Sequence, residues 1–313
     1  MIAERQVGEH TALVMGSDGP DGIEASFVPS AGMVGCSLRH RGEELLGQRG
    51  GLARYVEERS TMGIPLLHPW ANRVAVRRFS VAGRTVDLWA HPGLYTLGPK
   101  GLPIHGLLAA ADGWSVEQHE DTPEGPRLSA SFDFTGDDHR MAVFPFPHEL
   151  RIEAGIADQT LTIATTVRAS GDAAVPIAFG YHPYLRLPDV ERSAWHVEIP
   201  VSERVVLDSE ELPTGEVEPA EVPSGPLGSR TFDDEFAAPA DPFVLEGGGR
   251  RIEVSLLDGY PYAQVYAPED DDVIAFEPMT APTNALVDDG PALQLVSPGG
   301  SYQASFSIAV SGA

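Results

Sequence analysis

A single carboxylate near the end of the chain, Glu277, follows a hydrophobic run and is followed at once by Pro278. Because proline disfavours the helical conformation in the residue before it, we expect Glu277 to end an extended strand. A carboxyl group among apolar neighbours has its ionised form disfavoured, and the resulting rise in pKa suits proton transfer. The same side chain could instead pair with an arginine in a structural role, so its own stretch leaves both interpretations open.

Two histidines lie in settings that favour chemistry. His182 also precedes a proline, which holds its backbone extended, and Phe179, Tyr181 and Tyr184 surround it in the sequence. Such aromatic residues form the kind of wall against which a sugar or an aromatic ligand packs. His105 precedes a glycine in an apolar loop, where the backbone can approach a ligand closely. Either histidine could be a core residue, because only a minority of titratable side chains belong to sites.

Several polar or aromatic residues could hold a polar ligand. Asn72 and Arg73 stand just before a predicted strand, and an arginine there could bind hydroxyls, bind a carboxylate or tie down a loop. Trp114 could stack on a sugar face or lie in the core. Asp233 belongs to an acidic cluster between two phenylalanines, and could accept hydroxyls or lie on a solvated loop tip. The amide of Gln264 suits two-point binding of hydroxyls.

Other chemistries find no support in the sequence. It contains no H-E-x-x-H motif, and Cys36 is the only cysteine, so no metal is expected. No G-x-G-x-x-G follows a strand, no G-K-[ST] loop is present and no G-x-S-x-G elbow occurs. The sequence therefore predicts neither nucleotide-dependent chemistry nor a serine hydrolase.

Charge and composition narrow the partners. The 313 residues carry a formal net charge of -25, and Lys100 is the only lysine. The negative electrostatic field of such a charge disfavours binding of nucleic acid, anionic membranes and polyanionic substrates. It is compatible with a neutral or cationic small molecule. The lone cysteine suits a reducing cytosol, the first ten residues do not resemble a signal peptide, and no apolar stretch approaches the ~20 residues that span a bilayer. We therefore expect a cytoplasmic protein.

Short alternating segments dominate the chain and predict an all-β fold. Each is bounded by Gly, Pro, Asp or Ser, as strands in an antiparallel sandwich or barrel usually are. The segments are residues 23–28, 127–134, 150–156, 161–168, 195–201, 251–257, 262–266 and 302–310. We expect one domain over residues 1–313, with an irregular acidic excursion at residues 208–228 and a single helical turn near residues 284–289 that Asn284 could cap.

In this order and spacing, the motifs resemble those of the aldose 1-epimerase (mutarotase) family. The residues that carry the resemblance are Ala71-Asn72-Arg73, Ile104-His105-Gly106 with Trp114, Gly180-Tyr181-His182-Pro183-Tyr184, Asp233-Asp234-Glu235-Phe236, Gln264 and Glu277-Pro278-Met279-Thr280. The family's fold is a large antiparallel β-sandwich, the galactose mutarotase-like supersandwich with few short helices. The strand pattern above agrees with it.

The resemblance implies interconversion of the α and β anomers of a free aldose, without a metal or organic cofactor. Glu277 matches the family's general base and His182 its general acid. His105, Arg73, Asp233 and Gln264 match positions that contact or hold the sugar, and Asn72, Trp114 and Tyr184 are further candidates beside them. The implied partner is a small monosaccharide, and the implied assembly is a monomer or a homodimer.

The chain also departs from the family's pattern, which leaves its sugar specificity open. His68-Pro69-Trp70 stands where Gly-Arg is common, Gly-Leu follows His105 where a glycine pair is common, and His182 lies in Tyr-His-Pro-Tyr where Asn-His-Thr-Tyr is frequent.

Three alternatives to an aldose epimerase remain at this stage. A hexose-6-phosphate 1-epimerase would use the same acid and base, with Arg77, Arg78 and Lys100 available for a phosphate. A glycosidase or lyase would use Glu277 and Asp233 as a carboxylate pair. A non-catalytic carbohydrate-binding protein would use the same side chains as hydrogen-bond partners only.

Overall fold

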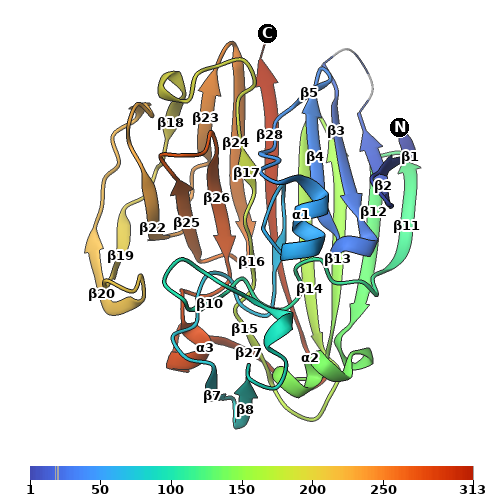
Figure 1. Cartoon of the computed structure of the whole chain (residues 1–313). Helices are drawn as coiled ribbons and strands as arrows, with labels where there is room; N and C mark the ends of the chain where they lie inside the picture. Colours follow the sequence, from blue (N-terminus) through green and yellow to red (C-terminus); the bar gives the residue numbers. More distant parts are fainter. Residues whose placement is uncertain (18, 20, 313) are drawn as a thin grey trace.

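The computed structural model describes residues 1–17, 19 and 21–312, and its framework is three large antiparallel sheets (Figure 1). The nine-stranded sheet contains, in order, β11 (Ser115–Thr122), β12 (Gly125–Asp133), β13 (His148–Ala157), β14 (Thr160–Ala169), β28 (Ser301–Gly312), β24 (Arg250–Asp258), β23 (Phe243–Gly247), β18 (His196–Glu198) and β21 (Gly225–Pro226). The eight-stranded sheet contains β20 (Pro213–Pro219), β19 (Glu203–Leu207), β22 (Phe232–Ala237), β25 (Tyr262–Ala267), β26 (Ile274–Met279), β16 (Gly180–Tyr181) and β6 (Leu66–Leu67), with β17 (Tyr184–Leu185) also paired to β26.

The third large sheet and several shorter elements complete the fold. A five-stranded sheet is formed by β1 (Ile2–Val7), β2 (His10–Gly16), β3 (Ile23–Val28), β4 (Val34–His40) and β5 (Glu43–Glu44). Two-stranded pairs are β7 (Arg78–Val81) with β8 (Arg84–Asp87), β9 (Thr96–Leu97) with β10 (Pro103–Ile104), and β15 (Val175–Ile177) with β27 (Gln294–Val296). The helices are short: α1 (Gly51–Glu58), α2 (Asp138–Val143), α3 (Ala285–Asp288) and the 3-10 turns η1 (Pro29–Ala31), η2 (Pro92–Leu94), η3 (Phe134–Gly136) and η4 (Arg192–Ala194).

Alternation of apolar and polar residues explains why these strands form. In β14, Leu161, Ile163, Thr165 and Val167 are buried while the residues between them are not. The two-residue turn 158–159 that joins β13 to β14 has left-handed backbone at both positions, which matches the twist of an antiparallel hairpin. Each of the eight predicted strand segments overlaps a strand of the structure, so the all-β prediction is confirmed.

The nine- and eight-stranded sheets pack face to face as a sandwich. The rings of Phe243 on β23 and Phe276 on β26 stack with centroids 4.9 Å apart, and Tyr181 on β16 meets Phe306 on β28 at 5.1 Å. One continuous cluster of buried apolar side chains includes residues from both sheets and from the five-stranded sheet. Because side chains alternate along a strand, the neighbours of Phe276 on β26 point to the opposite face of the eight-stranded sheet.

Some local expectations were wrong. Residues 208–228 are not irregular throughout, because β20 pairs with β19 as a hairpin and β21 pairs with β18. The helical turn at α3 is confirmed, but Asn284 does not cap it with its side chain; its Oδ1 accepts a hydrogen bond from the amide of Ala75. Strand β26 also runs past Glu277 to Met279, since an extended backbone accommodates Pro278.

Candidate active site

Three neighbouring strands present a row of polar side chains on the outer face of the eight-stranded sheet. Gln264 on β25 lies opposite Glu277 on β26 on one side and Glu235 on β22 on the other. Asp233 and Tyr266, two residues along, form the next cross-strand pair. Because alternate residues share a face, all five side chains leave the sheet in the same direction, away from Phe276 and the core.

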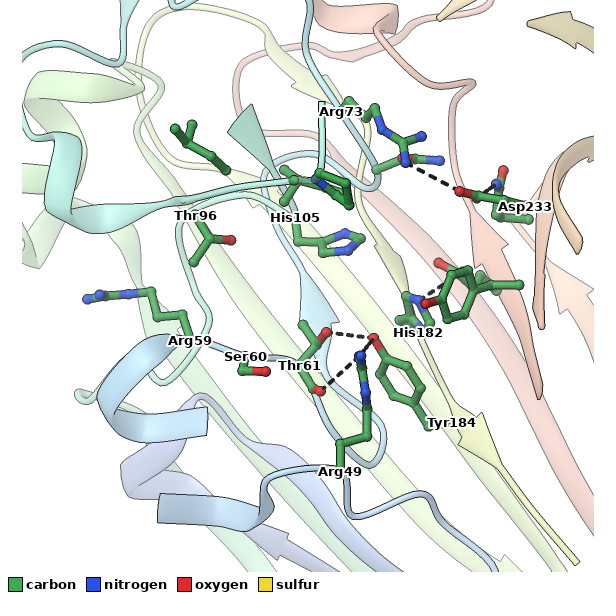
Figure 2. A pocket seen from close by; sticks show the side chains of 18 of the residues that line it. Arg49, Arg59, Ser60, Thr61, Arg73, Thr96, His105, His182, Tyr184 and Asp233 are labelled. Atoms are coloured by element: carbon green, nitrogen blue, oxygen red, sulfur yellow. Dashed lines mark hydrogen bonds and ion pairs between the residues drawn. The ribbon is translucent and has the colours of Figure 1, made fainter. Parts of the chain in front are cut away.

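His182 reaches this row because its strand is interrupted. β16 and β17 both pair with β26, at Met279 and at Ala275, and the residues between them leave the ladder. The backbone at His182 is therefore free of the strand pairing, and the His182 Nε2 lies 3.1 Å from the Glu277 Oε1. Its ring stacks on Tyr184 with centroids 4.0 Å apart, which fixes the orientation of the imidazole (Figure 2).

Two loops bring Asn72, Arg73 and His105 to the same place. The amide of His105 donates to the carbonyl of Asn72 at 2.9 Å, and Arg73 pairs with Ile104 in an isolated bridge. Asn72 and His105 both have left-handed backbone, with φ of 53° and 64°, a conformation that non-glycine residues adopt at a cost of about 1 kcal/mol or more. The ring of His105 stands perpendicular to that of His182, with centroids 5.7 Å apart.

Arg73 and its partners form the polar wall of the site. Arg73 Nη2 donates to Asp233 Oδ2 at 3.4 Å, and Gln264 Nε2 donates to Asp233 Oδ1 at 2.6 Å (Figure 2). Within the described part of the chain, Arg73 Nε and Nη1 and Gln264 Oε1 are buried and have no hydrogen-bond partner, and neither have the Nδ1 atoms of His105 and His182. Since unpaired buried polar atoms are costly, this set matches a ligand with several hydroxyl groups.

Together these side chains line a pocket of about 370 Å³, which is within the usual range for small-molecule sites. Of the residues predicted from the sequence, the pocket contains Asn72, Arg73, His105, His182, Tyr184, Asp233, Gln264 and Glu277. Trp114 is not among them: its ring packs on Phe132 with centroids 5.4 Å apart, and 8% of the residue is exposed. Proximity to His105 in the sequence therefore does not bring Trp114 to the site.

Burial sets the protonation of the two central groups in opposite directions. The pKa of the Glu277 carboxyl is raised well above its usual value by burial and then by the Asp233 carboxylate, with Arg73 opposing. The pKa of His182 is lowered well below its usual value by burial, then by His105 and Arg49. Burial also lowers the pKa of His105 to about 3, with Arg73 and Arg49 adding to the effect. Both shifts favour the neutral forms, so burial favours the state in which Glu277 holds the proton and His182 does not.

The pocket also contains residues that the sequence analysis missed. Arg49 Nη1 donates to the Tyr184 hydroxyl at 2.9 Å, and the Thr61 hydroxyl lies 2.6 Å from the same oxygen (Figure 2). Arg59 lies on the side of the pocket away from Asp233. Tyr266 could have been found, because it lies two residues after Gln264 on the same strand face. Nothing in the loop and helix of residues 49–61 marks them for chemistry.

Two further properties concern metals and membranes. In the described residues, no group of three or more His, Cys, Asp or Glu side chains has an arrangement that could hold a metal ion. Over the same part of the chain, no helix has the length and apolar character needed to cross a bilayer.

Comparison with known proteins identifies the family. A family model for aldose 1-epimerase matches residues 32–309, so the chain belongs to the aldose 1-epimerase family, and this membership supports a carbohydrate epimerase. No curated protein matches the sequence.

Solved structures share the fold at low sequence identity. A galactose mutarotase-like protein from Clostridium acetobutylicum has a TM-score of 0.84 and 18% identity, with 100% of this chain and 99% of that chain covered. Slr1438 from Synechocystis has a TM-score of 0.74 and 22% identity, with 100% and 96% covered. A galactose 1-epimerase from Lactobacillus acidophilus has a TM-score of 0.75 and 13% identity, with 100% and 98% covered. The galactose mutarotase-like fold expected from the sequence is therefore confirmed.

Proposed function

We propose that the protein interconverts the α and β anomers of a free aldose by opening and closing the sugar ring. The observation that carries the proposal is the buried contact between His182 and Glu277 on the floor of the pocket, at 3.1 Å. Anomer exchange needs one base and one acid close to a single C–O bond, with roles that reverse on closure. Arg73, Asp233 and Gln264 supply the donors and acceptors that would hold the hydroxyl groups.

In the ring-opening step, ionised Glu277 takes the proton from the hydroxyl on C1, and protonated His182 gives its proton to the ring oxygen. The bond between C1 and the ring oxygen breaks as the carbonyl forms, and rotation about C1–C2 precedes closure to either anomer. The enzyme pair carries one proton before and after the step. Burial favours neutral His182 and protonated Glu277, so the reactive form with the proton on His182 is the less populated form of the empty site, and the pair returns to the favoured form as the ring opens.

Polarimetry of freshly dissolved α-glucose or α-galactose tests this proposal. We expect the protein to accelerate mutarotation with a bell-shaped pH dependence, since the reactive form of the pair carries one proton. Glu277→Gln should reduce the catalysed rate at least about a hundredfold, which is the low end of general acid–base contributions.

A matched control is Glu149→Gln, which changes a partly buried glutamate on β13 of the nine-stranded sheet that does not line the pocket. Its catalysed rate should stay close to that of the wild type. Normal mutarotation by Glu277→Gln, in a protein whose unfolding midpoint is unchanged, would rule out the mechanism. Cleavage of a chromogenic glycoside would favour a glycosidase, and binding of sugar without any rate would favour a carbohydrate-binding protein.

A specific observation favours one second candidate, a hexose-6-phosphate 1-epimerase. Four arginines line the pocket of this otherwise acidic protein: Arg49, Arg54, Arg59 and Arg73. Arg54 pairs with Glu58 at 2.7 Å, Arg49 pairs with Asp271 at 3.1 Å, and Arg73 pairs with Asp233. Measuring glucose 6-phosphate beside glucose and galactose separates the two candidate functions, because the preferred substrate has the larger kcat/KM.

A further inference from the structure

The acidic segment after β19 places one carboxylate at the edge of the pocket. The turn that joins β19 to β20 is built on Asp208, whose Oδ1 accepts from the amides of Glu210 at 2.8 Å and Leu212 at 3.1 Å. The amides of Asp208 and Glu211 close the turn through Leu212 and Asp208 carbonyls, at 2.8 and 3.0 Å. A turn held by four hydrogen bonds fixes the position of the residues at its tip.

The backbone of Glu211 at this tip is left-handed, with a φ of 62°. A glutamate in this conformation is disfavoured by about 1 kcal/mol or more, and such residues persist only where surrounding contacts hold them. The contacts in this case are two cations from distant parts of the chain. Glu211 Oε2 contacts Arg73 Nη2, and Glu211 Oε1 lies 3.9 Å from Lys100 Nζ.

The contact with Arg73 is largely removed from water. The Arg73 side chain is 5% exposed, and the Oε2 atom of Glu211 is itself buried, although 29% of the Glu211 side chain is exposed. Asp233 Oδ2 lies 3.4 Å from the same Nη2 atom. Two carboxylates thus neutralise the arginine through one nitrogen, and its Nε and Nη1 atoms remain without a partner in the described part of the chain.

This arrangement has a consequence for the choice of ligand. Arg73 belongs to the pocket, and Lys100 follows the pocket residues Gly98 and Pro99 in the chain. Arginine and lysine side chains are common binding partners of phosphate and carboxylate groups. Here the protein's own Glu211 carboxylate takes that position, so an anionic group on a sugar would meet a negative charge instead of a free cation pair.

We propose that Glu211 is a specificity-determining residue that excludes sugars with a phosphate or carboxylate group while leaving Arg73 Nε and Nη1 for neutral hydroxyls. The inference rests on the proposed aldose epimerase function and names its substrate class as uncharged aldoses. The turn of residues 208–212 thereby has a role in selectivity, which favours a free aldose over a hexose 6-phosphate as the substrate.

The test compares Glu211→Gln with Glu210→Gln, which removes the same charge one residue earlier. Glu210 is exposed, and no ion pair involves it among the described residues. Binding of inorganic phosphate is measured by calorimetry at low salt, and kcat/KM is measured for glucose and glucose 6-phosphate. We expect Glu211→Gln to bind phosphate at least tenfold more tightly than the wild type and to shift the kcat/KM ratio toward glucose 6-phosphate at least tenfold. Glu210→Gln should stay within about twofold of the wild type, since it lies outside the cation pair.

A second variant, Glu211→Gly, suits the left-handed backbone and removes the carboxylate, so it should show the same gain if Glu211→Gln folds poorly. Unchanged phosphate affinity in both variants would overturn the inference, as would equal gains in Glu210→Gln. A wild type with no activity on any sugar would instead count against the proposed function, while the phosphate measurements would still decide the role of Glu211.

Discussion

At the scale of single residues, a buried pair of histidines, His68 and His148, lies next to the loop that carries His105. His148 Nδ1 lies 2.6 Å from the Phe146 carbonyl oxygen, so this nitrogen carries the proton and donates. His148 Nε2 then has a lone pair and accepts from His68 Nε2 at 2.8 Å. Burial lowers the pKa of His148 to about 4 and that of His68 well below its usual value, so both rings are neutral at pH 7. The carbonyl of His68 in turn accepts from the amide of Leu107, beside His105.

This pair makes the fold sensitive to acid. Because the pKa of His148 is lower in the folded state than in the unfolded one, the unfolded chain binds more protons between about pH 4 and 6.5, and stability falls as pH falls through that window. The free energy of unfolding should drop by roughly 2 kcal/mol at pH 5 from this residue alone. His148→Gln, whose amide does not titrate, should lessen the loss seen in urea titrations at pH 7 and pH 5. An equal loss in this variant would contradict the assignment, and the exposed His139→Gln is the control.

At the scale of elements, one glycine fixes the contact between the two loops that carry Arg73 and His105. Gly106 has a φ of +75°, and a Cβ added there would lie 2.2 Å from the His68 carbonyl oxygen. Gly101 in the same segment has a φ of +74°, and a Cβ added at that position would have no atom within 4 Å. The two sites therefore share the same backbone strain and differ only in the steric clash.

Alanine at each position separates these effects. Gly101→Ala should lower the free energy of unfolding by about 1 kcal/mol through the left-handed backbone alone. Gly106→Ala should cost more, because the clash pushes His105 and its neighbours away from the site, and mutarotation should fall at least about tenfold. Urea titration and polarimetry on both variants check this, and equal stability and activity of the two would show that the close approach to His68 is unimportant.

How far the elements could be predicted depends on whether the signal is local. Strand β14 and its hairpin turn follow from alternation and turn residues, and Glu277 and His182 stand out because each precedes a proline in an apolar or aromatic setting. Glu211 could not be found in this way. It is one acidic residue among many in its segment. Its contact with Arg73, which lies far away in the sequence, depends on the hydrogen bonds of the folded turn. The prediction that Trp114 belongs to the site was wrong for the same reason, because its position depends on a packing contact with Phe132.

At the scale of the whole molecule, the net charge of -25 means that the excess acidic side chains repel one another and destabilise the compact state. Raising sodium chloride from about 20 mM to about 200 mM shortens the Debye length from about 20 Å to about 7 Å, so the repulsion is screened. We expect the thermal unfolding midpoint to rise over this range. Potassium chloride should give the same rise, because screening depends on ionic strength and not on the cation. A falling midpoint would mean that screened ion pairs, such as Arg5 with Glu24, contribute more than the repulsion.

The pocket draws its side chains from residues as far apart as Arg49 and Glu277, on helix α1, strands β9 and β10, several loops and four strands of the eight-stranded sheet. Contacts of such long sequence separation form late in folding, because the chain entropy of closing long loops must be overcome first. A fragment that begins after Arg49 or ends before Glu277 therefore lacks part of the site. During refolding, secondary structure should return before the two histidines and the glutamate regain their mutual geometry.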